Sequence, residues 1–158
     1  MTIRQAVSAE AEQIARVINA AFKPAESFFV DGDRTDLAHV LEYFHKGVFL
    51  VPDDLGGCVY VELRGDRAYF GLLSVDPSRQ KSGTGKRLIA AAEDYARNHG
   101  CRFLDITVVN LRAELPPFYR SLGYVESGTR QFDGEDAPTK LPCHFICMTK
   151  PLTSPSDT

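Results

Sequence analysis

The sequence predicts a single α/β domain built from about seven strands and four helices. Its 158 residues suit one domain, and 44% hydrophobic with 25% charged residues is ordinary for a globular protein. Apolar residues recur at helical spacing in some segments and alternate, as in half-buried strands, in others. Because no repeat or linker divides the chain, residues 1–150 are expected to form the domain and residues 151–158 a flexible tail.

A short strand over residues 2–6 and an amphipathic helix come first in the predicted order. Ser8 suits the N-cap of this helix, because its hydroxyl can accept a backbone hydrogen bond. Pro24 is expected to end the helix near Phe22, since proline lacks the N–H that a helix interior needs.

A second helix is expected from an N-cap at Asp33 or Thr35 to a stop at Gly47. The residues predicted to face inward share helical spacing: Leu37, Val40, Leu41 and Phe44. Three strands joined by tight turns are then expected, over residues 48–51, 58–63 and 68–75.

The second half of the chain predicts a helix, a strand, a short helix and a hairpin. A third helix follows residue 86, and Gly100 supplies its left-handed stop. A strand over residues 102–109 comes next. The prolines at 116 and 117 are expected to delay the fourth helix, which places Tyr119 in its first turn. An antiparallel hairpin over 124–132 and 144–150 ends the domain.

The segment between the strand over 68–75 and the third helix has the composition of a phosphate-binding loop. Residues 80–86 read Gln-Lys-Ser-Gly-Thr-Gly-Lys, and two glycines before a helix free backbone N–H groups to bind an anion. A P-loop would need glycine at position 80 and serine or threonine after Lys86. A dinucleotide fingerprint would need glycine in place of Leu88. An ordinary strand-to-helix turn is the alternative.

A second motif follows one helix and one strand later. Residues 118–124 read Phe-Tyr-Arg-Ser-Leu-Gly-Tyr. This segment and the Gln-x-x-Gly-x-Gly loop together resemble two signatures of the GNAT superfamily of acyl-CoA-dependent N-acyltransferases. The resemblance implies a central mixed, mostly antiparallel sheet of about seven strands flanked by four helices, splayed between strands 4 and 5.

The same resemblance implies how coenzyme A is bound. The pantetheine arm would pair with the backbone of the fourth strand around Leu73 and Val75, and Asn110 would contact the cofactor arm. A loop asparagine that bonds its own backbone is the alternative for Asn110. The pyrophosphate would lie on the loop, whose expected binding residues are Gln80, Lys81, Gly83, Thr84, Gly85 and Lys86.

Tyr119 matches the tyrosine that acts as general acid toward the leaving thiolate in this superfamily. A phenol, with a pKa of about 10 against about 8.5 for a thiol, stays protonated at neutral pH. Aromatic packing is the alternative for this side chain. The general base stays open, because the fourth strand has no carboxylate at the expected stretch. Ordered waters or a free amine would need none, and four residues are candidates: Glu26, Glu62, Asp105 and His144.

The resemblance implies direct transfer of an acetyl group from acetyl-CoA to a primary amine, in a ternary complex and without a metal. A small-molecule amine acceptor is expected. Acetylation of a protein lysine or N-terminal amine, and a non-catalytic acetyl-CoA-binding module, are the alternatives. The loops over 23–36 and 132–143 would frame the acceptor, and they lean acidic, which suits a cationic amine or simply a solvated surface. Phe28 and Phe29 would plug the core or line a pocket.

Composition restricts the partners further. A net charge of −3 gives no broad basic field, so nucleic acid is not expected as a partner. No apolar run has the length of a membrane span and no signal peptide is apparent, so we expect a cytoplasmic protein with no membrane partner. The four cysteines lack metal-ligand spacing, and Cys143, His144 and Cys147 have no fourth ligand. A homodimer is compatible with the sequence.

Overall fold

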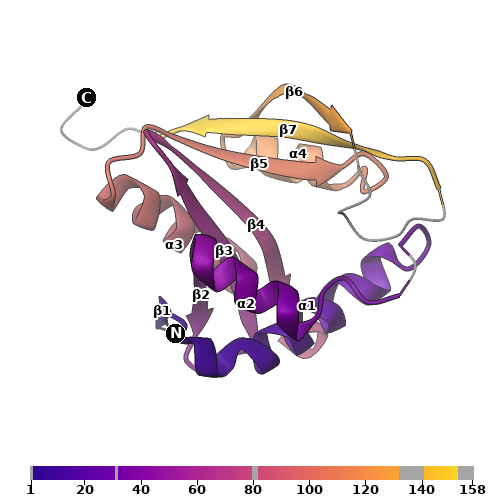
Figure 1. Ribbon diagram of the computed structural model, residues 1–158. Helices are drawn as coiled ribbons and strands as arrows, with labels where there is room; N and C mark the ends of the chain where they lie inside the picture. Colours follow the sequence, from indigo (N-terminus) through magenta and orange to yellow (C-terminus); the bar gives the residue numbers. More distant parts are fainter. Residues whose placement is uncertain (1, 31, 80–81, 132–140, 153–158) are drawn as a thin grey trace.

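The computed structural model describes residues 2–30, 32–79, 82–131 and 141–152 (Figure 1). In this part of the chain one seven-stranded sheet has the order β1-β2-β3-β4-β5-β7-β6. The strands are β1 (Ile3–Gln5), β2 (Val48–Pro52), β3 (Gly57–Arg64), β4 (Arg67–Val75), β5 (Phe103–Val109), β6 (Val125–Gln131) and β7 (His144–Pro151). The helices are α1 (Ala11–Glu26), α2 (Leu37–Lys46), α3 (Thr84–Asn98) and α4 (Leu115–Ser121), with 3-10 turns η1 (Ser8–Glu10) and η2 (Pro77–Arg79).

The sheet divides between β4 and β5, its parallel pair of neighbours. These two strands are in register over Arg67 with Phe103, Ala68 with Leu104 and Tyr69 with Asp105, whereas β5 pairs with β7 along its whole length. Figure 1 shows β4 and β5 starting together and then diverging into a V. The mixed, mostly antiparallel sheet and its predicted splay are confirmed.

An ion pair holds the closed end of this V. The Arg67 guanidinium donates to both carboxylate oxygens of Asp105, at 2.8 and 2.7 Å, and to the Thr149 hydroxyl at 3.1 Å. One side chain from β4 therefore reaches β5 and β7 where the strands are still paired. A bidentate arginine–carboxylate contact fixes geometry as well as charge, so it defines the point at which the strands separate.

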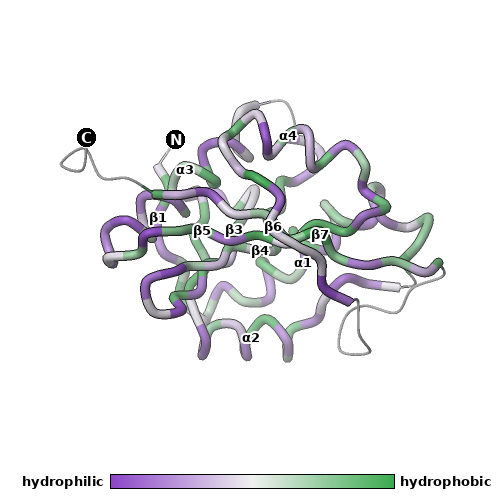
Figure 2. Tube along the Cα trace, turned by 90° about the horizontal axis from the view of Figure 1, so that it is seen from above, coloured by the Kyte–Doolittle hydropathy of each residue, from purple (hydrophilic) through white to green (hydrophobic). Residues whose placement is uncertain are grey.

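Helices cover both faces of the sheet. Viewed from above, α3 and α4 lie on one face and α1 and α2 on the other (Figure 2). The larger core lies under α3, which buries Leu88, Ile89, Ala92 and Ala96 against the sheet. The second core joins α1 to β2 and β3, and α2 packs against α1 and β2. Both layers therefore hold β4, and α3 also contacts β5.

The start and end of α1 differ from the sequence prediction. Ser8 lies in η1 and caps nothing; instead the Glu10 carboxylate accepts the N–H of Val7 at 3.0 Å. Pro24 lies inside α1, which continues to Glu26. A single proline near the C-terminal end removes one hydrogen bond, while the apolar stripe of α1 still packs on the sheet, so packing outweighs the local penalty.

The capping residue and the buried face of α2 also differ. Asp36, rather than Asp33 or Thr35, caps the helix, with its Oδ1 accepting the N–H of His39 at 2.9 Å. Gly47 follows the last helical residue as predicted. Val40 is fully buried, but two other members of the predicted inward face, Leu37 and Leu41, are 46% and 38% exposed.

The fourth helix starts earlier than predicted. Pro116 and Pro117 lie in its first turn, where the backbone N–H groups have no intrahelical partner and proline is well tolerated. The helix therefore begins at Leu115, and Tyr119 lies in its second turn rather than its first. Two residues assigned to the tail from the sequence are ordered parts of the fold: Pro151 belongs to β7, and Leu152 is buried, with its N–H donating to Arg102 O at 2.7 Å.

A buried polar network ties α3 to the end of the sheet. The Glu93 carboxylate accepts the Tyr124 hydroxyl at 2.9 Å and the Lys150 ammonium at 3.1 Å on each oxygen. Glu93 is 8% exposed, so each bond forms away from bulk water. Loss of one member would leave the others short of a partner in a place that water does not reach.

We expect Glu93→Gln to lower the free energy of unfolding by about 1–3 kcal/mol, because it removes the charge that satisfies a buried ammonium and a buried phenol. Urea unfolding at neutral pH measures this change. Glu12→Gln is the matched control, since Glu12 pairs with Arg16 on the exposed face of α1; its effect should stay within about 0.5 kcal/mol. Equal losses in both variants would contradict the structural role of the network.

Candidate active site

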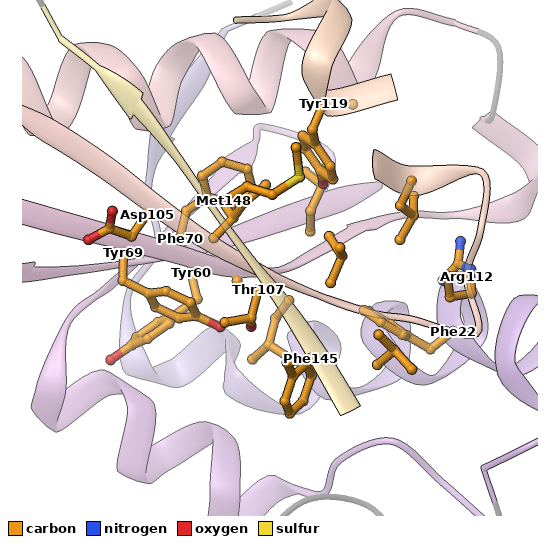
Figure 3. Close-up of a pocket in the computed structure, with 18 of the residues that line it drawn as sticks. Phe22, Tyr60, Tyr69, Phe70, Asp105, Thr107, Arg112, Tyr119, Phe145 and Met148 are labelled. Carbon is orange, nitrogen blue, oxygen red and sulfur yellow. The ribbon is translucent and has the colours of Figure 1, made fainter. Parts of the chain in front are cut away.

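A cavity of about 1240 Å³ fills the V between β4 and β5. Its walls come from α1, from β3 to β5, from the start of α3, from α4 and from β7. Figure 3 shows aromatic side chains facing this space from several elements, including Phe22, Tyr69, Phe145 and Tyr119. The separation of the strands therefore produces a cleft that is open to ligands and lined by both layers of the protein.

The start of α3 forms one end of the cleft. Gly83 has φ +82°, a left-handed conformation that a side chain would strain, and it precedes the first helical residue, Thr84. The first helical bond in this turn runs from the Arg87 N–H to the Gly83 carbonyl at 3.1 Å. Among the described residues, no backbone or side-chain group accepts the N–H groups of 83–86. These groups and the positive end of α3 can therefore bind an anion.

Four predicted loop residues line the cleft: Gly83, Thr84, Gly85 and Lys86. Gln80 and Lys81 lie outside the described residues. The Thr84 side chain is buried and its hydroxyl lies 2.7 Å from that of Ser82, which holds the turn. At Gly85 an added Cβ would lie 3.7 Å from Val75, an ordinary contact, so Gly83 is the position where backbone conformation requires glycine.

The middle of β4 is irregular where it borders the cleft. Cys58 is opposite Ser74 but Tyr60 is opposite Gly71, so β4 carries one extra residue. Leu72 takes up the difference with φ +55°, a strained conformation for leucine, and its carbonyl accepts the Ser74 hydroxyl at 2.9 Å. Beyond Tyr69 no strand of the described chain pairs with β4 on its β5 side, so the backbone there faces the cleft.

Leu73 and Val75 line this part of the cleft and are partly exposed; the pairing of their backbone with a pantetheine arm stays a prediction. Asn110 lies outside the cleft lining. Its Oδ1 accepts the N–H of His144 at 2.8 Å, and its own N–H donates to His144 O at 2.9 Å. Asn110 thus joins the end of β5 to the start of β7, and its contact with a cofactor arm stays a prediction.

Tyr119 reaches the cleft from α4. Its ring packs against Phe70 and Tyr124, with centroid separations of 6.1 and 5.7 Å. Figure 3 shows the side chain pointing from α4 into the pocket. Its hydroxyl makes no hydrogen bond with a described residue. Burial raises the pKa of Tyr119 to about 12, although the charge of Arg112 opposes the rise. The cleft therefore holds an uncommitted phenol that stays protonated over the physiological pH range.

A buried ion pair stands beside Tyr119. Arg112 Nη1 donates to the Glu26 carboxylate at 2.8 Å, and the two side chains are 17% and 7% exposed. Burial raises the pKa of Glu26, and the hydrogen bond and charge of Arg112 act against that rise. This pair joins the end of α1 to the loop after β5, so it closes one side of the cleft.

The remaining candidate bases are also engaged. Glu62 accepts the Tyr60 hydroxyl at 2.7 Å and a hydrogen bond from Arg64, and Asp105 is paired with Arg67. His144 is exposed and lies outside the cleft lining. In the described part of the cleft every carboxylate therefore has an arginine partner, and none stands free to take a proton.

Sequence reasoning missed several side chains of this cleft. Arg34, Arg112 and Tyr69 line it, yet their positions in the sequence resemble those of ordinary loop or strand residues. Arg34 carried no signal of its own, because only the path of the loop between α1 and α2 brings it to the cleft.

The two neighbouring phenylalanines differ in burial. Phe29 is fully buried in a small core with Val109 and Phe145, while Phe28 is 54% exposed.

The described residues contain no group of three or more His, Cys, Asp and Glu side chains placed to hold a metal ion. They also contain no helix that is both long and apolar enough to cross a membrane.

Residues 12–124 match the family model of the acetyltransferase (GNAT) family, so the chain belongs to this family. It is therefore an acyltransferase, and the resemblance drawn from the two sequence motifs is confirmed. A search of curated proteins finds no significant match.

Solved structures agree on the fold. The ribosomal-protein-S18-alanine N-acetyltransferase from Escherichia coli is similar with a TM-score of 0.72 and 17% identity, over 97% of this chain and 94% of that chain. The yncA protein from Salmonella typhimurium, solved with its cofactor acetyl-CoA, has a TM-score of 0.73 and 19% identity over 98% and 95%. An aminoglycoside 6'-N-acetyltransferase complexed with coenzyme A has a TM-score of 0.73 and 19% identity over 98% of each chain.

We expect Arg112→Gln to destabilise the protein more at about pH 7.5 than at about pH 5. Loss of Arg112 removes the interactions that lower the pKa of Glu26, so this pKa rises further above its unfolded value. A raised carboxyl pKa favours the folded state at low pH, and that contribution is lost as pH rises through the folded pKa. Urea unfolding at the two pH values measures the difference.

The control for this experiment is Glu26→Gln in the Arg112→Gln background. It removes the titrating group, so the extra destabilisation at the higher pH should disappear. The same loss at both pH values in the Arg112→Gln single variant would show that Glu26 is not the group responsible.

Proposed function

We propose that this protein transfers an acetyl group from acetyl-CoA directly to the primary amine of a small molecule, in a ternary complex. The observation that carries the proposal is the continuity of one cleft. It runs from the N–H groups at the start of α3, along the edge of β4 that faces the gap, to the hydroxyl of Tyr119, and among the described residues neither these N–H groups nor this hydroxyl has a hydrogen-bond partner. These are the three features that a coenzyme A thioester needs.

The pyrophosphate of coenzyme A fits the start of α3. The N–H groups of Gly83, Thr84, Gly85 and Lys86 are available there, the helix dipole favours negative charge, and the Lys86 side chain lines the same wall. The pantetheine arm would take the place of the missing strand beside β4, next to Leu73 and Val75. Unpaired strand edges bind extended amides through backbone hydrogen bonds, so no special side chain is required.

Tyr119 would act on the departing sulfur. Acetyl transfer forms the amide C–N bond, breaks the C–S bond, and moves one proton from the amine to the thiolate. A phenol with a pKa of about 12 is a weaker acid than a thiol, so Tyr119 stabilises the thiolate by donating a hydrogen bond. The proton that sulfur finally keeps comes from the attacking amine, directly or by relay through the phenol.

The amine would enter as its free base. The carboxylates of the described lining are held by arginines, so the proposal assigns no dedicated base, and ordered water can help to relay the proton from the amine to the sulfur. The rate at subsaturating acceptor should then rise with pH as the free-amine fraction rises. The fold alone does not choose the acceptor, since similar structures include an enzyme named for ribosomal-protein alanine and one named for aminoglycosides.

Mass-spectrometric detection of transfer from labelled acetyl-CoA tests the proposal. The acceptors would be small amines, amino acids, aminoglycosides, and peptides with a free N-terminus or lysine. Turnover of small amines supports it. Turnover of peptides alone would favour a protein acetyltransferase, and tight acetyl-CoA binding without transfer to any acceptor would favour a binding module.

Tyr119→Phe should lower kcat by about 10²–10⁴-fold, because it removes the hydrogen-bond donor to the leaving sulfur and keeps the ring that packs on Phe70. Affinity for acetyl-CoA, measured by calorimetry, should change little. Tyr95→Phe is the control: Tyr95 lies on α3, stacked on His99 and outside the cleft lining, and its loss should leave kcat unchanged. An unaltered kcat in Tyr119→Phe would remove this residue from the mechanism.

Gly83→Ala should weaken coenzyme A binding by about tenfold or more, because a left-handed conformation costs a non-glycine residue about 1–2 kcal/mol and relaxing it would turn the N–H groups away. Gly100→Ala is the matched control. Gly100 has the same φ of +82° and no atom within 4 Å of an added Cβ, but it lies at the other end of α3. Both variants should lose stability in thermal unfolding; equal coenzyme A affinities would contradict the assigned phosphate site.

A further inference from the structure

The cleft has a positive wall on the face of the sheet that carries α1 and α2. Arg34, Lys46, Arg64, Arg67 and Arg130 line it, against the carboxylates of Glu26, Glu62 and Asp105. The whole chain has a net charge of −3, so this concentration of positive charge is local. The loop sequences predict an acidic acceptor site, whereas this wall of the cleft is positive.

Ion pairing neutralises the carboxylates of this lining but leaves two of its cations without an ion-pair partner among the described residues. Each of the three carboxylates is held by an arginine: Glu26 by Arg112, Glu62 by Arg64 and Asp105 by Arg67. Arg34 and Lys46, by contrast, form no ion pair with a carboxylate among the described residues, although the charge of Arg34 acts on Glu26 and that of Lys46 acts on Glu62. The charge that this lining offers to a ligand is therefore positive.

The positive wall and the phosphate site approach the cleft from opposite faces. Glu62, Tyr69 and Asp105 are partners in register across β3, β4 and β5, and Tyr69 packs on the core under α1. The start of α3 belongs to the other layer, whose core contains Phe70. Figure 2 shows these helices on opposite sides of the sheet. The phosphates of coenzyme A therefore do not account for Arg34 or Lys46, which are left for the acceptor.

Arg34 is the side chain best placed to bind an anion. It is half-buried, its guanidinium carbon lies 5.6 Å above the Phe22 ring centroid, and the loop that carries it is fixed by Asn19, which bonds both N and O of Thr35 at 2.9 and 3.0 Å. A guanidinium held against a ring retains a donor edge that matches a carboxylate in bidentate fashion. Its charge also acts on Tyr69, whose pKa burial raises and Arg34 lowers, so Arg34 is within electrostatic reach of the open end of β4.

From these contacts we propose that the acceptor is an amine that also carries a carboxylate, as in an amino acid, and that Arg34 binds this carboxylate while Lys46 adds to the field. This inference rests on the proposed acetyl transfer. The same positive wall has a second effect on such a substrate. Nearby positive charge disfavours an ammonium, so it lowers the pKa of the bound amine and raises the fraction that can attack the thioester. Binding and deprotonation then use the same residues.

Matched pairs of amines test the proposal: L-phenylalanine with phenethylamine, L-leucine with isoamylamine, and L-methionine with 3-(methylthio)propylamine. Each pair differs by one carboxylate. With saturating acetyl-CoA, kcat/KM is measured for both members, and we expect the carboxylate-bearing member to be preferred by about tenfold or more in the pair that reacts best. The preference should fall in high salt.

Arg34→Gln should reduce this preference to about threefold or less, and Arg34→Lys should give an intermediate value because it keeps the charge and loses the bidentate edge. Arg16→Gln is the control, since Arg16 pairs with Glu12 on the exposed face of α1 and lies outside the cleft lining. The preference is a ratio measured on one preparation, so it does not depend on the fraction of protein that is folded.

The outcomes separate the two proposals. Equal or better turnover of the amines that lack a carboxylate, or a preference unchanged in Arg34→Gln, would overturn the present inference and leave acetyl transfer to small amines standing. Transfer to neither member of any pair, with acetyl-CoA still bound, would overturn the present inference; acetyl transfer to a small amine would be overturned only if the wider acceptor panel described above also gave no product.

Discussion

The Arg67–Asp105 contact at the closed end of the V is the interaction on which the rest of the structure depends. It fixes β4 to β5 across the three residue pairs over which they are in register, and the strands part beyond the pair of Tyr69 and Asp105. Helix α1 packs on β4, and α3 packs on both β4 and β5. Because the helices hold the two strands in these positions, the gap between them persists as a cavity. The edge of β4, the start of α3 and the hydroxyl of Tyr119 all face this gap, so one local pairing decides where a ligand can bind.

The parts of the site that could be predicted are those encoded by local sequence. A strand, a glycine-containing turn and a helix start are neighbours in the chain, so Gly83 to Lys86 could be placed before the fold was known. Tyr119 was found in the same way, through a short motif. Arg112 could not be, because its partner Glu26 is 86 residues away and the pair exists only when α1 meets the loop after β5. Arg34 could not be predicted either, because only the path of the loop between α1 and α2 brings it to the cleft.

Element boundaries show the same division between local and tertiary effects. Pro24 and Pro116 both lie in helices, yet only the second position is favourable for proline, and α1 continues past Pro24 because its apolar face is packed. The sequence predicts Asp33 or Thr35 as the cap of α2. The structure selects Asp36, since Asn19 already holds the backbone of Thr35. Such choices depend on contacts with residues elsewhere in the chain.

The open edge of β4 has a consequence for the protein when no ligand is bound. Beyond Tyr69 its backbone amides lack a neighbouring strand inside the sheet, and an unpaired edge of this kind is a template for strands of another molecule. The walls of the cleft shield this edge, and the strained conformation of Leu72 interrupts the regular strand geometry of β4. A bound thioester arm would complete the hydrogen bonding of this edge, so the cofactor would act as a solubilising ligand as well as an acyl donor.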